Sequence, residues 1–177
     1  MDTSLRVRIG DAHIEHSWAY AKLVIDLYAR GECEQSRAFS YRGAEANEEL
    51  WALAKMAECA FAMWADLDPL DPQILNWRGL PDWWDVVVFG WRVDVKHTVA
   101  GSRLIWPLRK KELFNDAQFD VLALVRGEPP AFEITGVVHK ERFARHRFEE
   151  IKGGNLDPGT WYMKKGQLDH PRTLLRS

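Results

Sequence analysis

The stretch from Asp82 to Thr98, DWWDVVVFGWRVDVKHT, constrains the fold more than any other part of the chain. Two valine-rich runs flank Phe89-Gly90, and glycine readily supplies the positive φ that a two-residue hairpin turn needs. The pattern therefore predicts a β-hairpin. Because the turn fixes the pairing of the two strands, Asp85 is expected to face Asp94.

Side chains alternate between the two faces of a strand, which sorts the hairpin into a charged face and an apolar face. On the charged face the opposed carboxylates of Asp85 and Asp94 repel each other. A divalent cation would relieve this repulsion, since Mg²⁺ is commonly held by one or two carboxylates. Water together with Arg92 and Lys96 would also screen the charges, so the hairpin alone leaves a metal site and a hydrated face open. The apolar face, which we expect in the core, consists of Val86, Val88, Trp91, Val93 and Val95.

Two amphipathic helices are expected before the hairpin and several strands after it. Apolar residues three and four positions apart predict the helices, and alternating or continuous apolar runs bounded by turn residues predict the strands. The order fits an α/β (α+β) protein with a central mixed sheet flanked by helices. The predicted helices are 11–31, 44–68 and 140–151, and the further strands are 102–108, 119–125, 131–138 and 160–165.

The length of the chain, 177 residues, suits one domain with a sizeable core and is too short for two full-sized ones. We therefore expect a single domain over 1–177, with an N-terminal helical extension (1–44), a core (45–152) and a basic C-terminal segment (153–177). No apolar run approaches the roughly 20 residues of a membrane span, and no signal peptide is recognisable. These features predict a soluble intracellular protein. Cys33 and Cys59 lack disulfide or zinc spacing, so both are expected to be reduced.

Charge is distributed unevenly along the chain. Residues 1–74 contain 7 Lys and Arg against 13 Asp and Glu, a balance of −6, whereas residues 75–177 contain 17 against 13, a balance of +4. Basic clusters of this kind are typical of nucleic-acid-binding surfaces, although solvated helix faces and a basic tail explain them equally well. The candidate nucleic-acid contacts are Arg109, Lys110, Lys111, Arg142, Arg145 and Arg147.

Glu58 lies at the margin of the buried stripe predicted for the second helix. A carboxylate at such a position is either paired, with Lys55 the nearest base, or directed at something outside the helix. If the phase of the helix differs from the predicted one, Glu48 or Glu49 would take the place of Glu58. The helix dipole explains these two acids more simply, since acidic residues are favoured in first turns.

The succession of Glu58, Asp85, a turn, and Asp94-x-Lys96 resembles the site of the PD-(D/E)XK nuclease superfamily. The chain resembles the small single-domain members found in bacteriophage and prokaryotic genomes, and its site layout is similar to that of archaeal Holliday-junction resolvases and restriction endonucleases. The likeness covers roughly residues 45–170, since the segments AECAFAMW, DVVVFGWRVDVKHT, RLIWP, FDVLALVRGE, FEITGVVHKERF and YMKKGQL occur in the expected order.

The resemblance implies a restriction endonuclease-like αβββαβ core and a Mg²⁺-dependent deoxyribonuclease, an endonuclease rather than an exonuclease. By the same resemblance, Glu58, Asp85 and Asp94 would bind Mg²⁺, with Mn²⁺ able to substitute, and the main-chain carbonyl of Val95 would complete the ligands. Lys96 would position the attacking water or stabilise charge in the transition state. The implied partner is DNA, and the implied location is the cytoplasm of a prokaryotic or phage-infected cell.

Two points leave the resemblance open. The family's name-giving Pro-Asp pair occurs as Pro81-Asp82, so Asp82 competes with Asp85 as the ligand, although the hairpin pairing favours Asp85. The same fold could also serve as a catalytically inactive module that binds nucleic acid or another protein. The sequence does not decide between a monomer and a homodimer.

Overall fold

The structure, a computed structural model, describes residues 5–31, 44–78, 84–106, 114–150 and 159–176. A five-stranded sheet forms its centre, with the strand order β1-β6-β5-β3-β2. Only β3 and β5 run parallel, and the other neighbours are antiparallel, so the sheet is mixed as predicted. The strands are β1 (Arg6–Arg8), β2 (Val86–Val88), β3 (Trp91–Thr98), β5 (Val121–Glu128) and β6 (Ala131–His139).

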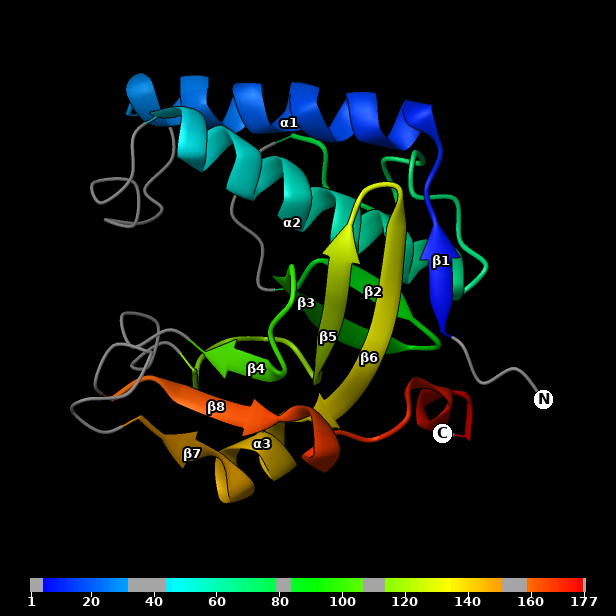
Figure 1. Cartoon of the computed structure of the whole chain (residues 1–177), viewed down its shortest axis with the longest axis vertical. Coiled ribbons are helices and arrows are strands. Elements are labelled where there is room, and N and C mark those ends of the chain that lie inside the picture. Colours follow the sequence, from blue (N-terminus) through cyan, green and yellow to red (C-terminus); the bar gives the residue numbers. More distant parts are fainter. Residues whose placement is uncertain (1–4, 32–43, 79–83, 107–113, 151–158, 177) are drawn as a thin grey trace.

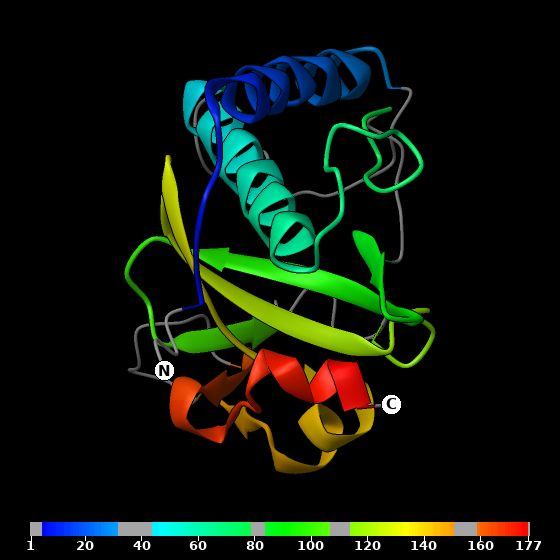
Figure 2. The same cartoon turned by 90° about the vertical axis from the view of Figure 1, so that its right-hand side faces the viewer.

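Two long helices, α1 (Asp11–Ala29) and α2 (Ala44–Trp64), cover one face of this sheet (Figure 2). Helix α2 lies between α1 and the strands, and its many alanines allow close packing on both sides. From Ala52 to Ala62 nearly every residue of α2 is buried. The apolar face of the hairpin packs here too, since Val86, Val93 and Val95 belong to the same core cluster as α2.

A smaller antiparallel sheet and one short helix cover the other face. The small sheet has the order β4-β8-β7, with β4 (Arg103–Trp106), β7 (Phe148–Glu149) and β8 (Trp161–Lys164), and the helix is α3 (Lys140–His146). Their apolar side chains form a second core cluster with Leu122 and Leu124 of β5. The expected flanking helices are confirmed by α1 and α2 on one face and α3 on the other, but the small antiparallel sheet that packs beside α3 was not expected. Two short 3₁₀ helices, η3 (Lys165–Gln167) and η4 (Pro171–Arg176), follow β8.

Two elements differ from the sequence prediction because of strand pairing. The helix expected over 140–151 ends at His146, because Arg147 is extended and Phe148 pairs with Tyr162 in the small sheet. Strand β1 was not expected, and it joins the sheet by pairing with β6. In both cases a partner distant in sequence decides the local structure.

Within the described residues, no helix is both long enough and apolar enough to cross a membrane. Cys59 is a free, buried thiol, and Cys33 lies outside the described residues.

Candidate functional site

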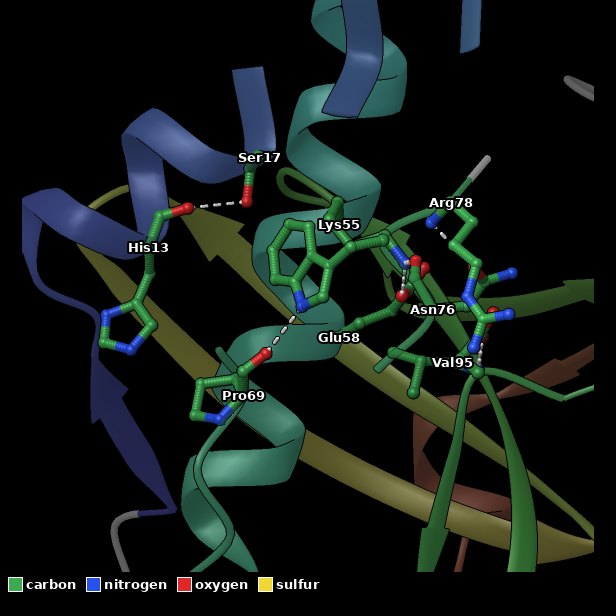
Figure 3. A network of polar contacts seen from close by, with 10 residues as sticks. His13, Ser17, Lys55, Glu58, Pro69, Asn76, Arg78 and Val95 are labelled. Carbon is green, nitrogen blue, oxygen red and sulfur yellow. Dashed lines mark hydrogen bonds and ion pairs between the residues drawn. The ribbon is translucent and has the colours of Figure 1, made fainter. Parts of the chain in front are cut away.

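Helix α2 places Lys55 and Glu58 one turn apart in the protein interior, where they form an ion pair (Figure 3). Lys55 is only 3% exposed and Glu58 8%. The ammonium group of Lys55 also donates to the main-chain oxygen of Asn76 at 3.1 Å and lies 4.3 Å from the ring centre of Tyr20. These contacts hold both charged groups at fixed positions beside the sheet.

The charges around Lys55 keep it protonated. Burial alone would lower the pKa of Lys55, but the Glu58 carboxylate, with smaller contributions from Tyr20 and Asp85, raises it above its ordinary value. A buried lysine of this kind is a permanent cation. It offsets part of the negative charge that Glu58 brings into the core.

The hairpin has the predicted register, with Val86 facing Val93 and Val88 facing Trp91. The strand pairs end at Val86 and Val93, so the expected position of Asp85 directly opposite Asp94 is not found. The main-chain N–H of Asp85 donates to the oxygen of Val93 at 2.9 Å, and its carboxylate accepts the N–H of Val95 at 2.6 Å. The side chain of Asp85 is thus directed back across the hairpin onto β3.

Asp94 and Lys96 lie on the same face of β3 and form an ion pair with an Nζ–Oδ1 distance of 2.5 Å. The Lys96 ammonium also lies 5.3 Å from the ring centre of Trp106 on β4. Burial would lower the pKa of Lys96, but Asp94, followed by Asp85, raises it. The lysine predicted to take part in catalysis is therefore charged and oriented by an aspartate two residues away.

Burial and neighbouring charges raise the pKa values of two of the predicted carboxylates, Glu58 and Asp85. Burial raises the pKa of Asp85 well above its usual range, and the negative charges of Glu58 and Asp94 raise it further. Burial, with Asp94 adding to it, likewise raises the pKa of Glu58, while Lys55 and Lys96 oppose the shift. Glu58, Asp85, Asp94 and Lys96, predicted from separate parts of the sequence, thus share one electrostatic environment.

The donor set suits Mg²⁺ in its chemistry, because carboxylates and main-chain carbonyls are the hard oxygen ligands that this ion prefers. In the structure, however, these carboxylates do not converge on one metal position. Among the described residues, no three His, Cys, Asp or Glu side chains gather in a group that could hold a metal ion. One oxygen of each carboxylate accepts a hydrogen bond, from Lys55, Lys96 or the Val95 amide. Asp82, the competing ligand, lies outside the described residues.

The described arginines predicted to contact nucleic acid have different surroundings. Arg142 forms an ion pair with Asp169, which holds α3 against the chain segment after η3. Arg145 is highly exposed and pairs weakly with Glu141 at 3.6 Å. Arg147 lies over the ring of Trp161 at 3.6 Å. The cluster Arg109, Lys110 and Lys111 lies outside the described residues.

Sequence reasoning did not single out Trp106 or Asp120. Asp120 precedes β5 and binds Arg92 of β3 through two side-chain hydrogen bonds of 2.9 and 2.7 Å. The parallel register of β3 and β5 explains this pair. Val93 faces Val121, so Arg92 and Asp120, the residues that precede them, lie side by side. Trp106 reaches Lys96 only because the small sheet packs on the central one, which local pattern does not reveal.

Comparison of the chain with known protein families, with curated proteins and with solved structures gave no match.

Proposed function

We propose that the chain is a Mg²⁺-dependent nuclease that hydrolyses DNA phosphodiester bonds, with endonucleolytic cleavage of internal bonds. The observation that carries this proposal is that burial and the negative charges of Glu58 and Asp94 raise the pKa of Asp85, next to a charged lysine on the same strand as Asp94. Perturbed, mutually coupled titratable groups are characteristic of functional sites. The order of helix, hairpin and Asp-x-Lys on the second strand adds the resemblance to the PD-(D/E)XK superfamily and its αβββαβ core.

Each residue has a role that its surroundings support. Glu58, Asp85 and Asp94, with the carbonyl of Val95, would hold the ion, and Mn²⁺ would serve in place of Mg²⁺. Bound there, the ion would activate water and neutralise charge on the scissile phosphate. Lys96, held at 2.5 Å by Asp94, would present a fixed cation where negative charge develops in the transition state.

Cleavage of a DNA substrate by Asp94→Ala and Lys96→Ala variants tests this assignment. We expect each variant to lose at least about 100-fold in Mg²⁺-dependent rate, since each removes a group that stabilises charge at the reacting phosphate. Glu15→Ala, an exposed acid on α1, is the matched control and should cleave like the parent. Retention of parental rates by both site variants, with circular dichroism showing intact folds, would refute the site.

A catalytically inactive binding module is the second candidate, and one observation favours it. Each carboxylate already has an internal hydrogen-bond donor, and the described residues form no ready three-ligand metal group. Calorimetric titration with Mn²⁺ separates the two candidates. A nuclease should give a binding signal that Asp85→Asn weakens, whereas the inactive module should give none in either protein.

A further inference from the structure

The small sheet has an outer face turned away from the second core cluster. Strand alternation assigns the faces, because Leu104, Trp106 and Met163 are buried in that cluster. Their neighbours along the strands therefore point outward. The outer face consists of Arg103 and Ile105 from β4, Phe148 from β7, and Tyr162 and Lys164 from β8.

Two aromatic rings lie side by side on this face. Phe148 is directly opposite Tyr162 in the strand pairing, and their ring centres are 5.5 Å apart with an interplanar angle of 29°. Phe148 is 42% exposed although it lies within a β-strand. The exposed ring of Phe148, with the half-buried ring of Tyr162 beside it, offers a platform on which a further flat ring system can stack.

Two cations lie next to the rings. The guanidinium of Arg103 is 4.8 Å from the ring centre of Tyr162, and the ammonium of Lys164 is 5.4 Å from that of Phe148. Glu150 binds Arg103 at 3.2 Å and compensates part of its charge. Lys164 is exposed, so the face keeps a positive group beside each ring and suits a ligand that carries phosphates next to flat rings.

We propose that the outer face of the small sheet binds single-stranded nucleic acid, with bases stacked on Phe148 and Tyr162 and phosphates near Lys164 and Arg103. Stacking on aromatic side chains, together with contacts from basic residues to the backbone, is how sequence-independent single-strand binding works. A duplex fits less well, because its bases are already stacked on each other. A purely apolar protein partner would gain nothing from the cations.

The inference adds a substrate class, an unpaired strand, to the proposed nuclease and rests on that function for its role in the cell. Lys96 lies over Trp106 of β4, and β4 also contributes residues to the outer face of the small sheet. Strand β4 therefore connects the candidate site with this face. Binding can nevertheless be measured without cleavage. Failure of one proposal is therefore distinguishable from failure of the other.

Fluorescence anisotropy with labelled oligothymidylate, oligouridylate and a duplex of equal length, in EDTA to prevent cleavage, tests the proposal with the full chain. We expect the parent to prefer either single strand over the duplex, and the two single strands show whether DNA or RNA is bound more tightly. Phe148→Ala and Tyr162→Ala should each weaken single-strand binding roughly 5- to 100-fold, and Tyr162→Phe should retain it. Lys164→Ala should weaken it and reduce its salt dependence.

Matched controls lie on α1, where Trp18→Ala removes an exposed ring and Lys22→Ala an exposed cation. Both should bind like the parent. Phe148→Leu keeps apolar area without an aromatic ring, so its weakened binding would support stacking. Unchanged binding by Phe148→Ala and Tyr162→Ala, or parental affinity for the duplex equal to that for single strands, would overturn the inference, whatever happens to cleavage. Weakened single-strand binding in these variants, together with parental binding but lost cleavage in Asp94→Ala, would support both proposals.

Discussion

Lys55 and Glu58 depend on each other for their burial. If Lys55→Met removes the ammonium, Glu58 stays in the interior without its ion-pair partner, and the oxygen of Asn76 loses a donor. Breaking a buried pair by removing one partner is strongly destabilising. We expect the variant to lose about 3–5 kcal/mol in the free energy of unfolding, measured by urea denaturation.

The double variant Lys55→Met/Glu58→Gln removes both charges and should recover much of this loss. Lys22→Met, at an exposed position of α1, should change stability by no more than about 0.5 kcal/mol. A single Lys55→Met variant as stable as the parent would mean that the ion pair does not hold Glu58 in place. The sequence left open whether Glu58 is paired or directed at a site. In the structure it is paired with Lys55, while burial and, to a smaller extent, the negative charge of Asp94 raise its pKa.

The hairpin is the element that sequence reasoning described most fully. Its register is confirmed from Val86 to Val88, where Phe89 and Gly90 form the turn with positive φ of 51° and 84°, as a two-residue hairpin turn requires, but the expected pairing of Asp85 with Asp94 is not among the strand pairs. The face assignment is confirmed as well: Val86 and Val88 are buried, whereas Val87 between them is 48% exposed. Turn chemistry and strand alternation are local rules, so a short sequence is enough to apply them.

Gly90→Ala tests how strongly the turn specifies the hairpin. A Cβ at this position would meet no atom within 4 Å, so the substitution introduces backbone strain without a clash. A side chain in the left-handed region costs about 1–2 kcal/mol, and we expect a loss of this size in thermal or urea unfolding. Gly166→Ala is the matched control, with equally open space and without positive φ, and should be near neutral or slightly stabilising. Equal effects of the two substitutions would contradict this account of the turn.

The small sheet shows where local rules fail. Strands β4 and β8 were expected, but nothing in either segment indicates that Arg103 pairs with Lys164. The two residues of β7 form a strand only because β8 lies beside them, and a basic helical pattern masks them in the sequence. The aromatic and basic outer face therefore has no recognisable sequence motif. The candidate site differs in this respect, because a recognisable sequence pattern connects Glu58, Asp85, Asp94 and Lys96.

At the scale of the whole molecule, ion pairs link segments that are far apart in sequence. Arg92 of β3 binds Asp120 before β5, and Lys165 of η3 binds Glu133 of β6 at 2.7 Å. The hydrogen bonds from Arg92 lower the pKa of Asp120, and the hydrogen bond from Lys165 lowers the pKa of Glu133. Both pairs are partly exposed to solvent, so each adds only a modest amount to stability.

These shifts set a pH dependence whose direction follows from linkage. A carboxylate whose pKa is lower in the folded than in the unfolded protein adds stability above its unfolded value, about 3.9 for Asp and 4.3 for Glu, and this stability is lost as the pH falls through the folded value. We expect the double variant Asp120→Asn/Glu133→Gln to melt a few degrees below the parent at pH 7. As the pH falls below about 4 the difference should shrink, because the carboxylates then take up protons in the unfolded protein first and in the folded protein only at lower pH. At pH 7, 1 M salt should shrink it by screening. Differential scanning calorimetry across this range measures the effect. A melting difference that stays constant from pH 7 to pH 3 would show that the two amides disturb packing rather than charge.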